Sequence, residues 1–308
     1  MRTDGADFRR VHMLIEVLPA VAAETCFALK GGTAINLFFL DLPRLSVDID
    51  LTYLPCSAYA EAAAGIDAAL RRIRGRLAAA APPFTVRLGP GRGSGHVDTL
   101  LVERDGLDIK IEVNPVLRGA LHAPALMAVR PAAEAHFGYA QMAVLAPDEV
   151  YAGKLVAALD RQHPRDLFDV KLLLDAGGLS DALFRAFLVY LAGHKGVMAH
   201  TLEPRLKDVA RLYREQLQDM VAEPVSLEAL VEARQRLISE IHARMGEAEK
   251  QFLLSVKRMR PDGSLIGLPQ AGELPAIRWK LHNLAQMTAA SHQAALANLE
   301  QALNRIGK

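Results

Sequence analysis

The sequence Lys-Gly-Gly-Thr-Ala at residues 30–34, followed by Arg-Leu-Ser-Val-Asp-Ile-Asp-Leu at residues 44–51, decides the fold of this chain. It predicts a strand, a glycine turn, a short helix and a second strand. Side chains alternate along a strand, so Asp48 and Asp50 point the same way. Two neighbouring carboxylates repel each other unless a cation lies between them, and Mg²⁺ that also binds substrate phosphates is the usual solution. The glycines expose backbone N–H groups that can bind phosphate. The stretch therefore predicts metal-assisted phosphate chemistry.

The bulk composition indicates a globular chain long enough for two domains. It has 308 residues, of which 51% are hydrophobic and only 6% are aromatic. This composition is typical of a helix-rich protein. The formal net charge of +1 means that nucleic-acid binding would need a local basic patch. Cys26 and Cys56 are expected to be free thiols in a reducing compartment. No signal-peptide pattern opens the chain and no apolar run reaches the ~20 residues of a membrane span, so we expect a cytoplasmic protein without membrane contact.

Hydrophobic periodicity predicts a mixed α/β part followed by an all-helical part. In the first part we expect, besides the strand at Asp48, helices at 8–22, 33–39 and 58–80 and strands at 26–30, 84–88, 97–103 and 107–113. Asp105-Gly106 predicts a hairpin, and the glycine-rich run 89–95 is expected to be a hairpin loop rather than a phosphate loop. From Pro147 onward we expect only helices: one from Pro147, one from near Arg165, and others at 180–192, 204–219, 226–257 and 275–304. The predicted domains are 1–140 and 141–308.

A second acidic strand supports the metal hypothesis. In Leu107–Val113, the side chains of Asp108, Lys110 and Glu112 share one face. If this strand lies beside the first acidic strand, Glu112 or Asp108 supplies a third carboxylate. Three acids holding two metal ions suit in-line phosphoryl displacement. The alternative is an ordinary amphipathic strand with a solvated face; the acidic pair upstream favours a functional role for Glu112.

A second charged cluster lies in the helical part and consists of Lys154, Arg161, Arg165, Asp166 and Asp169. Lys154 and Arg161 are two helical turns apart on one face, and the two aspartates are one turn apart in the next predicted helix. Cations near metal-bound acids would bind triphosphate oxygens. The alternative is a solvated helix face with acids near a helix N-terminus. The acidic strands upstream favour the triphosphate interpretation.

Taken in order, these motifs resemble the AbiEii/AbiGii nucleotidyltransferase toxins of the DNA polymerase β-like superfamily, which include the MenT toxins. The resemblance rests on residues 31–34, 44–51 and 109–112, on Lys154 with Arg161, and on 165–169. Residues 274–284 also resemble the family's C-terminal helical signature. Broader superfamily members often have Gly-Ser where this chain has Gly-Gly-Thr, which preserves a hydroxyl. The resemblance implies an α+β fold, with a polymerase β-like N-terminal domain on a mixed sheet and a helical domain that completes the active-site cleft.

The resemblance also implies a function. Such proteins are toxins of type IV, AbiE-like toxin–antitoxin systems, and they use a nucleoside triphosphate with Mg²⁺ or Mn²⁺. MenT relatives add nucleotides to RNA at the 3′ end of tRNA. A cognate antitoxin from a neighbouring gene is the implied partner.

Site residues are carried over by position in this sequence. The implied metal ligands are Asp48, Asp50 and Glu112. The implied contacts to the nucleoside triphosphate are Gly31, Gly32, Thr33, Ser46, Arg161 and Arg165. Lys154 is implied to bind the triphosphate, and the late catalytic acid is Asp166 or Asp169, with Asp166 preferred.

Two other functions remain open from the sequence. The nucleotide acceptor could be a protein side chain, because surfaces outside the motifs recognise the acceptor. A catalytically silent protein that binds a nucleoside triphosphate or RNA is the third hypothesis, and the retained carboxylates and glycine turn argue against it. The basic runs 71–76 and 257–260 are interpreted as solvated faces, or as RNA contacts if RNA is the acceptor.

Overall fold

The computed structural model describes residues 1–90 and 95–306, in two compact units. The sheet unit contains Met1–Val150 and Gln218–Pro224, and the helical unit contains Tyr151–Leu217 and Val225–Lys308. Residues 91–94 of the expected glycine-rich loop lie outside the described residues. No helix in the described ranges combines the length and apolar character of a membrane span.

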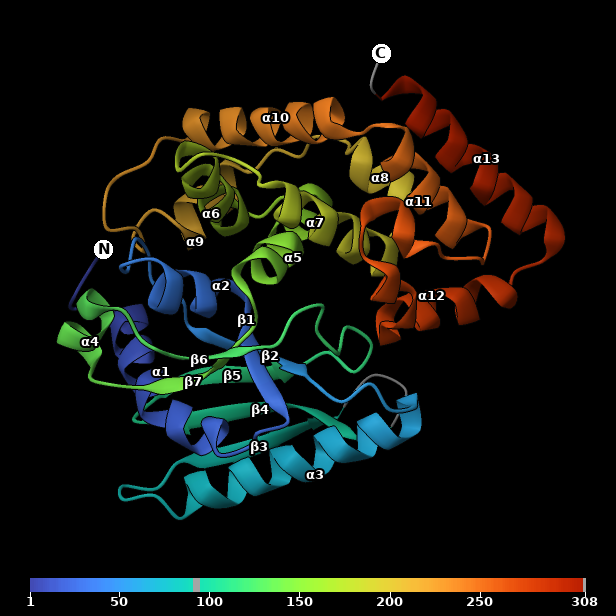
Figure 1. The fold of residues 1–308 in the computed structure, drawn as a ribbon. Helices are drawn as coiled ribbons and strands as arrows, with labels where there is room; N and C mark the ends of the chain where they lie inside the picture. Colours follow the sequence, from blue (N-terminus) through green and yellow to red (C-terminus); the bar gives the residue numbers. More distant parts are fainter. Residues whose placement is uncertain (91–94, 307–308) are drawn as a thin grey trace. The chain divides into compact units, whose positions relative to one another are not determined.

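A seven-stranded sheet forms the centre of the sheet unit, in the order β3-β4-β5-β2-β1-β7-β6 (Figure 1). Its strands are β1 (Phe27–Lys30), β2 (Asp48–Tyr53), β3 (Thr85–Pro90), β4 (Val97–Arg104), β5 (Leu107–Val113), β6 (Ala125–Ala128) and β7 (Gln141–Val144). The pairs β2–β5 and β1–β7 are parallel and the other neighbours are antiparallel. The expected mixed sheet is therefore confirmed. The short strands β6 and β7 were not predicted from the sequence.

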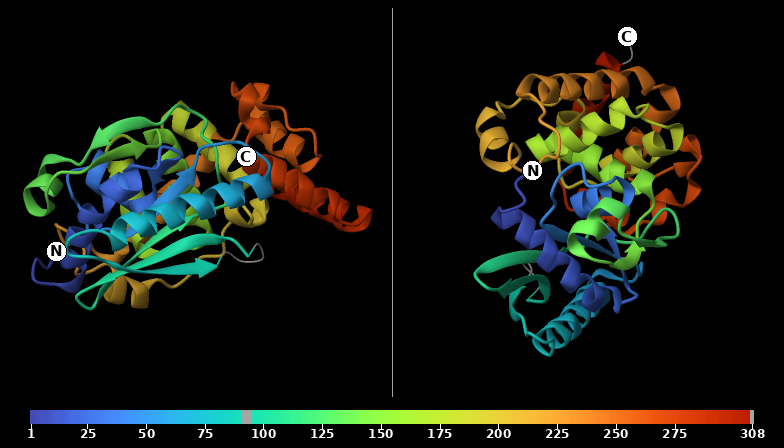
Figure 2. Two further views of the ribbon diagram at one scale, coloured as in Figure 1. Left: turned by 90° about the horizontal axis from the view of Figure 1, so that it is seen from below. Right: turned by 90° about the vertical axis from the view of Figure 1, so that its left-hand side faces the viewer.

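Two long helices of the sheet unit pack on the sheet, as Figures 1 and 2 show for α3 along β3 and β4. The helices of this unit are α1 (Ala6–Ala22), α2 (Gly31–Thr33), the π-helical η1 (Ala34–Phe39), α3 (Tyr59–Ala78) and α4 (Pro131–Phe137). At the centre of β2 and β5, Ile49 and Ile111 are fully buried while their neighbours Asp48, Asp50, Lys110 and Glu112 are partly exposed. Strand alternation thus separates an apolar face, which forms core, from a polar face.

The hairpin between β4 and β5 forms where the sequence predicts it. Asp105 and Gly106 have φ values of 53° and 73°, the positive values that a type I′ turn requires at both central positions. Arg104 and Leu107 pair directly on either side. The turn thus places the Asp108–Glu112 segment in a defined register.

Every regular element described after β7 is a helix, which confirms the all-helical C-terminal part. They are α5 (Pro147–Asp160), α6 (Pro164–Asp175), α7 (Asp181–Gly193), α8 (Met198–Leu202), α9 (Ala210–Gln216), α10 (Leu227–Arg244), α11 (Glu247–Lys257), η2 (Gly263–Ile266), η3 (Pro269–Glu273), α12 (Pro275–Ala285) and α13 (Ala289–Arg305). Two expected long helices are each divided: 226–257 breaks before Gly246, the N-cap of α11, and 275–304 breaks before Thr288, whose side chain caps α13.

The expected helix 204–219 is also wrong in part, because only Ala210–Gln216 is helical. Residues 218–224 instead belong to the sheet unit. There the Leu45 N–H donates to the Met220 carbonyl at 2.9 Å, and the Ala222 N–H donates to the Pro43 carbonyl at 2.8 Å. A segment distant in sequence therefore supports the chain that leads into β2.

Candidate active site

The two predicted acidic strands are neighbours in the sheet. β2 and β5 run parallel, with Asp48 opposite Lys110 and Asp50 opposite Glu112. Directly opposed residues of paired strands project from the same face. Asp48, Asp50 and Glu112 therefore share the polar face, as the sequence predicted for adjacent strands. Asp108 contacts Arg10 instead, at 3.5 Å between its carboxylate and the guanidinium.

Two lysines accompany these acids, and the sequence interpretation gave neither of them a role. Lys110 forms an ion pair with Glu112, and this hydrogen bond raises the pKa of Lys110. Lys30, on β1, lies opposite Asp50 of β2. Burial lowers the pKa of Lys30, while the negative charges of Asp50 and Glu112 oppose that shift. The period-two pattern already placed Lys110 on the acidic face, but its partner depends on side-chain packing.

The glycine turn lies directly against the acidic strand. Gly31 has φ +73°, a left-handed conformation that favours glycine. A Cβ at Gly31 would collide with the Asp50 carboxylate. A Cβ at Gly32 would lie 2.8 Å from Arg44 Nη2 and 2.9 Å from Ser46 Oγ. Both glycines are therefore required by close approach of the turn to β2 and the residues before it.

The predicted hydroxyl residues lie beneath this turn. The Thr33 hydroxyl donates to the Asp48 backbone carbonyl at 2.5 Å, and its oxygen lies 3.0 Å from Ser46 Oγ. Both side chains are buried. Arg44 is also buried, and its Nη1 donates to the Leu45 carbonyl at 2.8 Å. In this conformation Thr33 and Ser46 connect the turn to the start of β2 inside the protein.

In the helical unit, the predicted lysine lies between the two predicted aspartates. Lys154 Nζ is 2.7 Å from Asp166 Oδ1 and 2.9 Å from Asp169 Oδ2. Lys154 is 7% exposed and both aspartates are fully buried. Pro164 at the first position of α6 and the His163 N-cap begin the helix that presents both acids one turn apart. Both acids thus bind the same lysine.

Arg161 contacts the same carboxylate from the end of α5. Its Nε lies 2.5 Å and its Nη2 2.9 Å from the two oxygens of Asp166, a bidentate pair. Burial by itself would raise the pKa of Asp166, but the charges and hydrogen bonds of Lys154 and Arg161 outweigh it and hold that pKa well below its usual range.

Two further residues lie on the same two helices. Burial raises the pKa of Tyr151 to about 12. Arg165, in the first turn of α6, donates its backbone N–H to His163 Nδ1 at 3.2 Å.

The donor atoms on the polar face suit a hard divalent cation. Asp48 and Asp50 offer carboxylate oxygens on one face, the ligand type that Mg²⁺ and Mn²⁺ prefer. Glu112 is the nearest further acid by register, and here it faces Lys110. In the described ranges, no three histidine, cysteine or acidic residues are grouped so that they could hold a metal ion. The chemistry of the aspartate pair therefore fits the metal, with Glu112 available after a change of side-chain partner.

One other feature singled out in the sequence is the basic run at 71–76. In the basic run of α3, Arg71 pairs with Asp67, and Arg72 and Arg76 both pair with Glu24. These ion pairs are within the sheet unit and account for these three arginines without a ligand.

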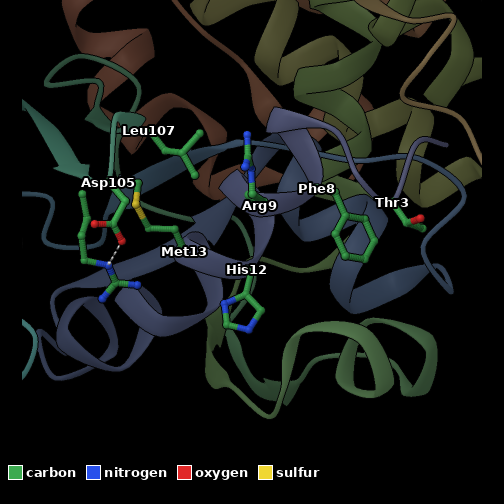
Figure 3. Close-up of a pocket in the computed structure, with 8 residues that line it drawn as sticks. Thr3, Phe8, Arg9, His12, Met13, Asp105 and Leu107 are labelled. Atoms are coloured by element: carbon green, nitrogen blue, oxygen red, sulfur yellow. Dashed lines mark ion pairs between the residues drawn. The ribbon is translucent and has the colours of Figure 1, made fainter.

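A pocket of about 400 Å³ lies between the start of α1 and the β4–β5 turn (Figure 3). Phe8, His12, Met13 and Leu107 are among the residues that line it, and Asp105 at its edge pairs with Arg104. No residue predicted for the active site lines it.

Acids on adjacent strands of a mixed sheet, behind a glycine turn, are the kind of groups that enzymes transferring phosphoryl or nucleotidyl groups use. The family comparison is specific. The model of the AbiEii family, described as a nucleotidyl transferase AbiEii toxin of a type IV toxin–antitoxin system, matches residues 12–283. The chain therefore belongs to the AbiEii family of nucleotidyltransferase toxins.

Similar solved structures include MenT4, a nucleotidyltransferase toxin from Mycobacterium tuberculosis, at 16% identity and a TM-score of 0.44, covering 98% of this chain and 92% of that one. A tRNA-processing enzyme in an apo form is similar at 10% identity and a TM-score of 0.23, covering 100% of both chains. A comparison with curated proteins gives no match. The family assignment rests on the family model.

Proposed function

We propose that this toxin is a divalent-metal-dependent nucleotidyltransferase that transfers nucleotides from a nucleoside triphosphate to RNA, at the 3′ end of tRNA. The observation that carries the proposal is the parallel pairing of β2 with β5. It puts Asp50 in register with Glu112 and Asp48 one pleat repeat away on the same face, directly beside the glycine turn. Family membership supplies the reaction class.

In the proposed reaction, the 3′ hydroxyl of the acceptor attacks the α-phosphorus of the nucleoside triphosphate, and the bond from that phosphorus to the pyrophosphate oxygen breaks. The hydroxyl proton leaves to solvent or a nearby base. Asp48 and Asp50 would hold Mg²⁺ or Mn²⁺, with Glu112 as a further ligand. When bound, such an ion lowers the pKa of the attacking hydroxyl and neutralises charge on the leaving group.

The remaining residues of the sheet unit are assigned from their contacts. The backbone at Gly31 and Gly32 is proposed to approach the phosphates, since side chains there would fill the space in front of Asp50 and Ser46. Thr33 and Ser46, buried beneath the turn, are proposed to keep that backbone and the start of β2 in position. This role refines the direct phosphate contact that the resemblance implies for both residues.

In the helical unit, Lys154, Arg161 and Arg165 are the proposed triphosphate-binding cations. The Arg161 side chain is 63% exposed, so its guanidinium is accessible to a ligand phosphate. Lys154 is enclosed by Asp166 and Asp169, and these acids orient its ammonium group. We keep Asp166 as the proposed late acid because it joins both cations.

The proposed partners follow from the family. A toxin of a type IV system implies a nucleoside triphosphate substrate and an antitoxin. We propose that the antitoxin is encoded by a neighbouring gene.

The test is nucleotide incorporation by purified protein. Each of four α-labelled nucleoside triphosphates is incubated with Mg²⁺ and either total tRNA, RNA depleted of tRNA, or protein extract. Label in tRNA that is removed by 3′ exonuclease supports the proposal. Label only in protein would instead establish a protein acceptor, and no label in any arm would favour the silent binding protein.

Asp48→Ala is the variant that tests the metal site, and Asp4→Ala is its control, because the Asp4 side chain is 78% exposed in the sheet unit and pairs with Arg2. Asp48→Ala should abolish incorporation and relieve growth inhibition. The control variant should still incorporate nucleotide and still inhibit growth. Full incorporation by Asp48→Ala would refute the assignment of the acidic face.

A further inference from the structure

The acidic face carries its own cations. Lys110 lies opposite Asp48 in the sheet and forms an ion pair with Glu112. Lys30 lies opposite Asp50. The three carboxylates and two ammonium groups sum to one negative charge. A divalent cation would meet a much weaker attraction there than at three unaccompanied carboxylates.

Lys110 is the lysine whose contact affects the proposed metal site most directly. Its ammonium group pairs with Glu112, the acid that lies in register with Asp50. The Lys110 and Glu112 side chains are 44% and 46% exposed, so both can change rotamer without repacking the core. A carboxylate oxygen that faces an ammonium group is not available to a metal ion in the same direction.

We propose that Lys110 competes with the divalent metal ion for Glu112 and thereby sets the metal affinity of the acidic face. This inference rests on the proposed function. In the metal-free protein, Lys110 neutralises Glu112. When the metal binds Asp48 and Asp50, Glu112 exchanges Lys110 for the metal ion, so each binding event includes the loss of one partly exposed ion pair.

The expected magnitude follows from the exposure of this pair. Ion pairs with similar exposure change an equilibrium by about 1.4- to fivefold. Lys110→Met retains the aliphatic stem and removes the charge, so it should strengthen metal binding by about that factor. Lys110→Arg retains a cation that can pair with Glu112, so its metal affinity should stay close to that of the unaltered protein.

The experiment titrates the full-length protein with Mn²⁺ alone and measures unbound Mn²⁺ by electron paramagnetic resonance. Lys171→Met is the matched control, because Lys171 pairs with Asp175 on α6 in the helical unit. It removes the same charge from the chain at an ion pair that contains no residue of the acidic face. Circular dichroism confirms that each variant is folded before titration.

Tighter Mn²⁺ binding by Lys110→Met, with unchanged binding by Lys110→Arg and Lys171→Met, supports the proposal. A double-mutant cycle tests whether the effect passes through Glu112: in a Glu112→Gln background, Lys110→Met should give less than half of the original gain. Equal gains in both backgrounds would show a general field effect and overturn the proposal, as would no gain at all.

The outcome is separable from that of the proposed function. If Asp48→Ala abolishes incorporation while Lys110→Met leaves Mn²⁺ affinity unchanged, the competition is wrong and the nucleotidyl transfer stands. If Asp48→Ala retains both incorporation and Mn²⁺ binding, the metal site itself is wrong.

Discussion

Replacing Lys154 by methionine should destabilise the helical unit strongly. The ammonium group lies 2.7 Å from Asp166 and 2.9 Å from Asp169, and both aspartates are fully buried. Removing one partner from a buried ionic cluster costs about 3–5 kcal/mol, because the remaining charges stay desolvated. Asp166 keeps its bidentate pair with Arg161. We therefore expect a loss near the lower end, about 3 kcal/mol.

The assay is urea unfolding at pH 7, monitored by tryptophan fluorescence. Trp279 on α12 is the single tryptophan of the chain and lies in the helical unit, so its emission reports on that unit. Lys171→Met is the control: the pair with Asp175 is partly exposed, and its loss should cost about 0.2–1 kcal/mol.

The reasoning fails if Lys154→Met costs no more than the control. A second variant distinguishes lost charge from lost packing as the cause of the destabilisation. Lys154→Met combined with Asp169→Asn removes one of the buried charges that the lysine neutralises, so it should recover part of the lost free energy of unfolding. No recovery would show that lost packing, rather than charge, causes the destabilisation.

Three further predictions concern the turn, its hydroxyl support and acid stability. Gly31→Ala should cost at least about 1–2 kcal/mol by urea unfolding followed by circular dichroism and should lower incorporation, because φ is positive and a Cβ meets Asp50; Gly75→Ala, in open space on α3, should be neutral or stabilising by about 0.5–1 kcal/mol. Thr33→Val should cost about 1–3 kcal/mol by the same circular-dichroism assay, since it removes the hydroxyl that donates to the partly buried Asp48 carbonyl of β2; an unchanged midpoint would contradict this. The pKa of Asp166 is lowered in the folded state, so its stabilising contribution is present above the unfolded pKa of about 3.9 and is lost as pH falls toward the folded value. The fluorescence-detected urea midpoint should therefore fall between pH 5 and pH 2, and a flat profile there would argue against a charged Asp166.

Local patterns were enough to predict the parts of the acidic site. Strand alternation placed Asp48 and Asp50 on one face, and a period of two did the same for Lys110 and Glu112. The Asp105-Gly106 turn was predictable because its backbone conformation depends on two residues with positive φ. Each of these inferences needs only interactions between residues close together in the chain.

Local patterns also predicted the ends of several helices and missed others. Pro164 begins α6 because its fixed φ suits the first helical position. The break at Gly246 was missed, because a helical hydrophobic period continues on both sides of it. The four-residue strands β6 and β7 were missed because Ala-Leu-Met-Ala and Gln-Met-Ala-Val carry little periodic or β-branched signal, whereas the equally short β1 was predicted from its place before the glycine turn.

By itself, the sequence determined which chemical groups are present and which neighbours along the chain share a face. Only the tertiary structure decided that Asp50 lies in register with Glu112, that Lys110 pairs with that glutamate, and that residues 218–224 support the chain before β2. It also decided that Lys154 and Arg161 meet on Asp166. The physical reason is that register, ion-pair partners and burial depend on contacts between distant segments, which form only when the core packs as a whole.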